Sequence, residues 1–351
     1  MIYLNDDVLN ISFPEIHKNA CAQINFQRTL RLPDDDVEHN LPPGLGSFPL
    51  RHIEDFDLKN ANQLKERGGI IMPMFQTDAL WLNFDSSSNS NDLPYPIAIK
   101  IGTGKICAIS GETWSQNLNR DPQDYAIIPD QPWLDGYNVG KNIVRQFVAA
   151  PLGSGHTVEE QLTGSASVGG IQIIAYPMKA KHYEKKNKKY HEMQDFRSDV
   201  CYSMSSSVNY SMEEDSFMGL TAGGSMEQEI YKDEHKFSSW DMRNSERCFI
   251  TIANAQQWMS LTGEEPPLSP ISARKYTAAG LPWFKYYDGD KSAIEGAKKL
   301  GTLKSIKDLG TRTGNPYQDE ENIVENPNVI STNVKSNKVS TAKKYIKSGK
   351  W

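Results

Sequence analysis

Apolar and polar residues alternate along several stretches in the first half of the chain. Such alternation occurs in "CAQINFQRTLRL" (residues 21–32) and "ALWLNF" (residues 79–84), and a period of two is typical of a half-buried β-strand. The stretch "PIAIKIGTGKICAIS" (residues 96–110) predicts a hairpin, because two alternating runs flank Gly-Thr-Gly. We therefore predict that the first 150 residues are mostly strands and turns.

The pattern changes after Pro177. Residues 179–199 are highly charged and predict a solvated helix, and residues 248–263 begin as a strand and become helical before Gly263. Further helices are predicted within residues 269–280 and 290–310. The expected fold class is α+β, with antiparallel sheet in a strand-rich N-terminal half and helices concentrated in the C-terminal half.

Composition along the chain predicts three parts: an N-terminal arm (residues 1–21), one large mixed unit (22–325) and a C-terminal arm (326–351). Within the unit, the Ser-rich residues 198–216 are a possible seam, either a linker or an ordered insertion. The C-terminal arm is rich in Asn, Ser and Lys, so little in it offsets the entropy lost on ordering. We expect a neighbouring copy of the chain to hold this arm.

Composition excludes several classes of protein. The 351 residues are 38% hydrophobic and 10% aromatic, which indicates a folded chain rather than a disordered one. A net charge of −6 provides no field that would attract nucleic acid or an anionic membrane. No apolar run reaches the roughly 20 residues of a membrane span, and the acidic start does not resemble a secretory signal.

The four cysteines lie far apart and form no C-x-x-C pair. This usage favours free thiols in the cytoplasm over a disulfide-stapled secreted fold. The spacing of metal-ligand residues is also absent, so no metal and no cofactor are predicted.

The glycine-rich turn "PLGSGHTVEEQLTG" (residues 151–164) has two interpretations. Thr157 followed by Glu160 fits a capping box at a helix start, with Gly164 at the helix end. Alternatively, the exposed N–H groups of the turn would bind an anion, and His156 would act near neutral pH. The capped helix is favoured, because the spacing matches no known phosphate loop.

A second stretch, "LTAGGSMEQEIY" (residues 220–231), repeats the order of glycines, a hydroxyl and an amide with Ser225 and Gln228. The repeat suggests either a weak internal duplication or a coincidence, of which coincidence is favoured because capping boxes are common. The Gly-Thr-Gly-Lys of the predicted hairpin fails the spacing of both phosphate-loop and dinucleotide fingerprints.

Two Pro-Trp segments, "DQPWLDGY" (residues 130–137) and "GLPWFKYYDGD" (280–290), pair an aromatic with acids and tyrosines. If these segments are buried, they would fix loops to a core, and this interpretation is favoured. If they are exposed, they would stack on sugars or anchor an interface. The candidate ligand-binding residues are Trp133, Asp135, Tyr137, Trp283 and Tyr286.

No catalytic signature is present: H-E-x-x-H and G-x-S-x-G are both absent. The candidate catalytic residues are His156, Glu159 and Glu227, and a glycosidase-like pair of Glu159 and Glu227 has no support from spacing. An enzyme is therefore the less favoured class.

Several stretches together resemble a family of uncharacterised bacterial and fungal proteins, among them "LPPGLGSFPLRHIEDF", "RGGIIMPMFQTDALWLNF" and "VRQFVAAPLGSGHTVEEQLTG". The resemblance runs from about residue 22 to about residue 290. It implies one continuous unit across the Ser-rich seam, and it implies no activity, cofactor or catalytic residue.

Two function hypotheses follow. The first is a non-enzymatic, self-associating structural or scaffold protein that forms a homo-oligomer or filament through its terminal arms. The second is a carbohydrate-binding protein or hydrolase, whose cleft would gather the Gly-rich turns, His156 and the Pro-Trp loops around a sugar or other small molecule.

Overall fold

The structure is a computed structural model, and it describes residues 1–35, 37–56, 62–86, 92–194, 217–267, 272–285, 291–313, 329–331 and 344–346. The Ser-rich seam and Tyr286 lie outside these residues.

Strand residues outnumber helical residues by about two to one. The strands are β1 (Ile2–Asn5), β2 (Val8–Ser12), β3 (Cys21–Thr29), β4 (Glu38–His39), β5 (Gly44–Ser47), β6 (Arg51–His52), β7 (Ile70–Pro73), β8 (Ala79–Asp85), β9 (Ile97–Thr103), β10 (Ile106–Cys107), β11 (Ala126–Ile128), β12 (Trp133–Leu134), β13 (Gly136–Gly140), β14 (Ile143–Pro151), β15 (Ile171–Pro177), β16 (Met218–Glu227), β17 (Glu246–Ala253), β18 (Trp283–Lys285), β19 (Val329–Ser331) and β20 (Lys344–Tyr345). The helices are α1 (Asn62–Arg67), α2 (Val158–Thr163), α3 (Ala180–Gln194), α4 (Ala255–Thr262), α5 (Ala273–Ala278), α6 (Lys298–Gly301) and α7 (Ile306–Thr313), with 3-10 turns at Ile53–Asp55 and Phe237–Ser239.

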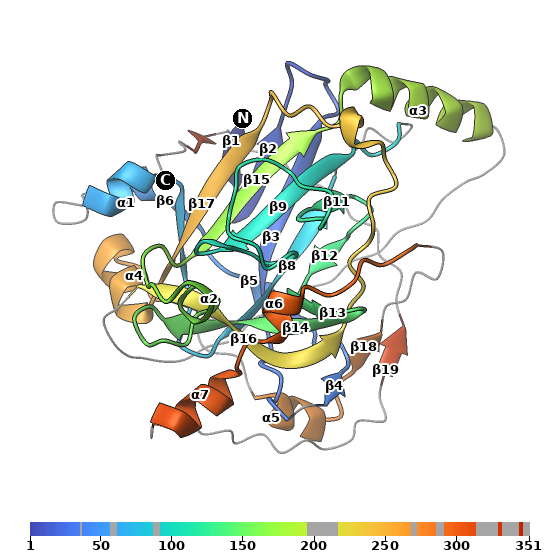
Figure 1. Cartoon of the computed structure of the whole chain (residues 1–351). Helices are drawn as coiled ribbons and strands as arrows, with labels where there is room; N and C mark the ends of the chain where they lie inside the picture. Colours follow the sequence, from blue (N-terminus) through green and yellow to red (C-terminus); the bar gives the residue numbers. More distant parts are fainter. Residues whose placement is uncertain are drawn as a thin grey trace.

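Two runs of strands build the main sheet (Figure 1). One run has the order β1-β2-β3-β8-β14-β16, and the other has the order β11-β9-β15-β17-β7-β6. They join where Met218 of β16 pairs with Ile252 of β17. Buried residues of both runs, such as Ile24 and Ile101, belong to one hydrophobic cluster, so the core lies between the two runs.

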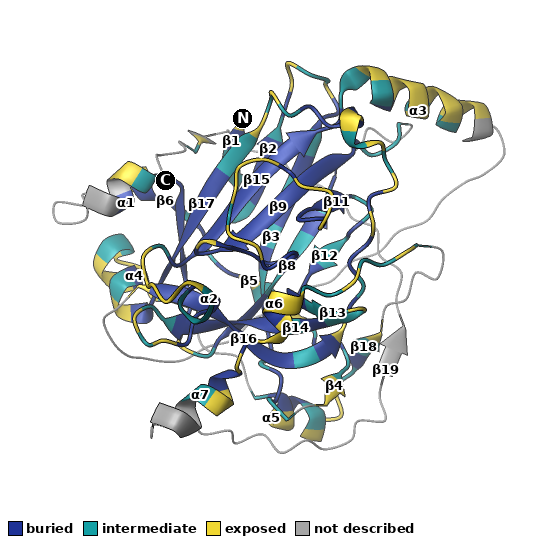
Figure 2. Ribbon diagram, viewed as in Figure 1, coloured by how far each residue is buried: buried dark blue, intermediate teal, exposed yellow. Residues whose placement is uncertain are grey.

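Most strand pairs are antiparallel, as predicted, and the hairpin of residues 96–110 is confirmed by the pairing of β9 with β10. The helix α3 is also confirmed and is largely exposed (Figure 2). Figure 2 shows the opposite pattern for β9, β15 and β17, which are buried along most of their length.

The placement of helices is confirmed only in part, and the fold is mostly β. Helices α1 and α2 precede residue 178, and the long strands β16 and β17 follow it. The second glycine-rich stretch, residues 220–231, does not begin a helix, because residues 218–227 pair with β14 along most of their length. Pairing with a neighbouring strand here overrides the local resemblance to a helix start.

The first twelve residues, which the sequence places in an arm, form the hairpin of β1 and β2 within the main sheet. Ile2, Leu9 and Ile11 are buried in the main hydrophobic cluster. Their alternation with polar residues explains why this segment pairs as a strand.

No helix among the described residues is both long enough and apolar enough to cross a membrane.

Candidate functional site

The glycine-rich turn before α2 closes on a carboxylate of its own chain. Glu160 Oε1 accepts the N–H groups of Gly153 and Gly155, at 2.9 and 3.0 Å. Glu160 Oε2 accepts the N–H and the hydroxyl of Thr157, at 3.1 and 2.7 Å. The predicted capping box is present, and Gly164 ends the helix with φ 71°. The N–H groups that an external anion would need are therefore already bonded.

His156 and Glu159 flank this cap and are both buried. Burial lowers the pKa of His156, which favours its neutral form. The Glu159 carboxylate accepts the N–H of Gly169 at 2.8 Å and the hydroxyl of Ser167 at 3.3 Å. Glu159 thus holds the loop that follows α2.

The first Pro-Trp segment forms β12 and the start of β13. Trp133 Nε1 donates a hydrogen bond of 2.5 Å to Asp135 Oδ2. Burial raises the pKa of Asp135 to about 7, while the bond from Trp133 acts in the opposite direction. Tyr137 is fully buried and donates its hydroxyl to Thr103 Oγ1 at 2.8 Å, so it lies in the core.

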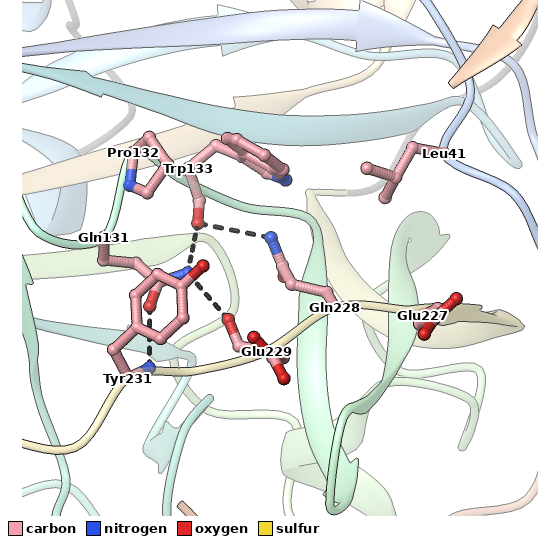
Figure 3. Close-up of a pocket in the computed structure, with 8 residues that line it drawn as sticks. All are labelled: Leu41, Gln131, Pro132, Trp133, Glu227, Gln228, Glu229 and Tyr231. Carbon is pink, nitrogen blue, oxygen red and sulfur yellow. Dashed lines mark hydrogen bonds between the residues drawn. The ribbon is translucent and has the colours of Figure 1, made fainter. Parts of the chain in front are cut away.

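A small hollow lies between the first Pro-Trp segment and the residues that end β16 (Figure 3). It is lined by Leu41, Gln131, Pro132, Trp133, Glu227, Gln228, Glu229 and Tyr231. Its volume is about 10 Å³, which is room for about one water molecule. The structure therefore brings the predicted residues Trp133 and Glu227 together, but the hollow does not admit a sugar ring.

Two buried glutamines hold the segment that follows β16, and one of them, Gln131, lines the hollow. Gln131 Nε2 donates to the carbonyl of Glu229, and its Oε1 accepts the N–H of Tyr231, both at 3.0 Å (Figure 3). Gln123 repeats the arrangement: its Nε2 donates to the carbonyl of Tyr231 at 3.0 Å and its Oε1 accepts the N–H of Asp233 at 2.8 Å. The two side chains act as a neighbouring strand would, and they fix the segment after β16 in place.

The second Pro-Trp segment follows α5 and contains β18. Trp283 is buried and donates from Nε1 to the hydroxyl of Thr277 at 3.2 Å. Its neighbour Phe284 exchanges two backbone hydrogen bonds with Leu41, at 2.9 and 3.0 Å. Leu41 also lines the hollow together with Trp133 of the first Pro-Trp segment. Tyr286 lies outside the part of the chain that is described.

These placements separate the predicted catalytic residues. Glu227 lines the hollow, whereas the Glu159 carboxylate bonds to the loop after α2. In the parts of the chain that the structure describes, no group of three or more His, Cys, Asp and Glu side chains could hold a metal ion.

The C-terminal strand β20 lies along β1, on the side away from β2. Tyr345 pairs with Tyr3, and the two rings meet edge to face with centroids 6.1 Å apart. The N–H of Ile346 donates to the carbonyl of Ile2 at 2.7 Å, and Ile346 packs against the main hydrophobic cluster. The end of the predicted arm is therefore held by a sheet edge.

Comparison of the chain with protein-family models, with curated proteins and with solved structures gave no match.

Proposed function

We propose that this protein is a non-enzymatic structural or scaffold protein that assembles with copies of itself by exchanging strand β20. In the assembly, β20 of one copy would pair with β1 of the next. The pairing of Ile346 with the outer edge of β1 carries this proposal.

An edge strand presents unpaired N–H and C=O groups, and it binds any strand that satisfies them. The pairing with β20 uses backbone groups, one tyrosine pair and the packing of Ile346 on the main hydrophobic cluster, and a second copy offers the same partners. Exchange of an identical element between copies leaves the contacts unchanged and is a low-cost route to an oligomer.

The length of the chain permits the exchange. Residues 332–343 connect β19 to β20, and twelve residues span at most about 40 Å when extended. Such a connection reaches a neighbouring copy whose β1 edge lies close by. A chain that gives and accepts one strand forms a closed dimer when the exchange is mutual, and a filament when it is not.

The proposal includes a cytoplasmic location and membership of the bacterial and fungal family that the sequence resembles. Among the described cysteines, Cys107 and Cys248 are buried free thiols, which supports a reducing compartment.

Light scattering after size exclusion, over a hundredfold range of concentration, tests the proposal. The full chain is expected to exceed its monomer mass of 39.5 kDa, increasingly so at higher concentration. Deletion of residues 326–351 is expected to give a monomer. Ile346→Pro is also expected to give a monomer, because proline lacks the N–H that bonds to Ile2.

Ser348→Pro is the matched control, since it introduces the same residue two positions beyond the pair. A full chain that stays monomeric at every concentration would contradict the proposal. An oligomer that survives both the deletion and Ile346→Pro would contradict it equally.

A further inference from the structure

Three facing positions cross the outer surface of the second run of strands. Gly102 of β9 lies opposite Gln172 of β15, which lies opposite Phe249 of β17. Directly opposed residues of antiparallel strands share a face, and this face is opposite the one that carries Ile101 and Ile173 of the core.

An aromatic ring covers one end of this row and a cation covers the other. A Cβ at Gly102 would lie 2.5 Å from the ring of Trp114, so only glycine lets that ring rest on the strand. At the other end, the Arg67 guanidinium lies 5.4 Å from the centroid of the Phe249 ring. Gln172 lies between them, on the floor of an open groove.

The volume of this groove is about 490 Å³, within the usual range of small-molecule sites. It is lined by Glu66, Arg67, Lys105, Thr113, Trp114, Ser115, Gln116, Ser167, Val168 and Gln172.

Trp114 forms one wall of the groove and is held in place by a backbone hydrogen bond and a buried cation. The N–H of Trp114 donates to the carbonyl of Lys105 at 2.8 Å, and the buried Lys100 ammonium lies 5.4 Å from the centroid of the Trp114 ring. Lys100 also donates to the hydroxyl of Ser115 at 3.0 Å and to Asp124 at 2.6 Å. The wall is therefore preformed.

The opposite wall is fixed in the same way. Arg67 donates to the carbonyls of Val168 and Ser167, at 2.9 and 3.0 Å, and Glu159 bonds to the same loop. On the floor, Gln172 Nε2 donates to the carbonyl of Gly104 at 2.5 Å.

The charge and the polarity of the lining residues indicate which kind of ligand the groove would bind. Arg67 and Lys105 are opposed by Glu66 in the lining and by Glu159 behind it, so the site is balanced and favours an uncharged ligand. The remaining polar lining consists of hydroxyls and amides, which match neutral hydroxyl groups. A ring with one apolar face suits the partly exposed Trp114.

We propose that this groove binds a neutral saccharide, with the apolar face of a sugar ring on Trp114 and its hydroxyls near Gln172 and Arg67. This site is separate from the Pro-Trp loops, and it does not depend on the exchange of β20.

Saturation-transfer NMR on the full chain tests the proposal, with a panel of glucose, galactose, mannose, N-acetylglucosamine, maltose and cellobiose as probes. Glucuronate and adenosine monophosphate extend the panel to charged rings. At least one neutral sugar is expected to receive saturation on its ring C–H protons. Binding is expected to weaken at least tenfold in Trp114→Leu and less than threefold in Trp114→Phe, which keeps an aromatic face.

Gly102→Ala gives a second test, because it displaces the ring of Trp114 without removing it; it is expected to weaken binding like Trp114→Leu. Ser165→Ala is the control, since Ser165 belongs to the same loop as Ser167 but does not line the groove. Thermal unfolding of each variant identifies any that fails to fold, and the folded variants decide the outcome. Absence of binding by every neutral sugar would overturn the proposal, as would binding that persists in folded Trp114→Leu or binding confined to the charged rings.

Discussion

Burial determines the chemistry of the single residues that the sequence singles out. Asp135 is only 4% exposed, and its carboxyl has a pKa of about 7. The local sequence shows that Asp135 lies close to Trp133 along the chain, but it does not show how deeply the two side chains are buried. An ordinary aspartate carboxyl is mostly ionised above about pH 4, whereas the Asp135 carboxyl stays mostly protonated up to about pH 7.

Asp135→Asn is expected to change how stability depends on pH. The native pKa is raised from 3.8 to about 7, so the folded state binds more protons than the unfolded state between those values. The free energy of unfolding of the wild type should consequently fall as pH rises from about 4 to about 7. Asparagine removes this titration and still accepts the bond from Trp133. The variant should be more stable at pH 8 by on the order of 1–4 kcal/mol.

Urea unfolding at pH 4, 6 and 8 measures this effect. Glu184→Gln, at an exposed carboxylate on α3, is the control and should leave the pH dependence unchanged. Parallel pH curves for the wild type and Asp135→Asn would show that Asp135 does not titrate in this range.

At the scale of elements, the local sequence predicts one hairpin and one helix start that the structure confirms. The hairpin of β9 and β10 follows from alternation around Gly-Thr-Gly, and the start of α2 follows from Thr157 and Glu160. Residues 220–231 resemble a helix start in sequence, but most of this stretch forms a strand paired with β14, a partner distant in sequence. Local rules identify a turn or a cap, but they do not identify the neighbour of a strand.

Glu160→Ala is expected to destabilise the protein by about 1–3 kcal/mol, because it removes an acceptor from the N–H groups of Gly153, Gly155 and Thr157. Thr157→Ala should have a smaller effect, about 1 kcal/mol, as for other helix caps. Thermal or urea unfolding at neutral pH measures both. Glu192→Ala on the exposed surface of α3 is the control, and equal stability of Glu160→Ala and this control would show that the turn does not need the carboxylate.

At the scale of the whole molecule, the groove assembles side chains from α1, β15 and three loops. No spacing in the sequence brings Trp114 to Arg67. The sequence places Gly102 in the Gly-Thr-Gly turn, whereas the structure places it within β9, where a glycine often marks the close approach of another group. The identity of the approaching ring depends on the fold.

The buried ion pair of Lys100 and Asp124 connects strand β9 to the loop that carries Trp114. Both side chains are nearly inaccessible, at 1% and 7% exposure. Lys100→Met is expected to reduce the free energy of unfolding by about 3–5 kcal/mol, because it leaves the Asp124 carboxylate buried without its cation.

The double variant Lys100→Met with Asp124→Asn should recover part of this loss, since it removes the isolated charge and keeps the acceptor for the N–H of Asn119. Urea unfolding of the wild type, both single variants and the double variant gives the coupling energy. Additive effects of the two substitutions would mean that the pair does not act as a unit.

The glutamines that fix the segment after β16 have a consequence for sequence change during evolution. Gln123 and Gln131 bond to backbone atoms of Tyr231 and its neighbours, and every residue except proline provides the same two groups. Their reach, however, depends on side-chain length, so asparagine is too short and glutamate lacks the donor. Among natural relatives, positions 123 and 131 should therefore stay glutamine, and these two glutamines by themselves place no constraint on the side chains of the residues whose backbones they hold.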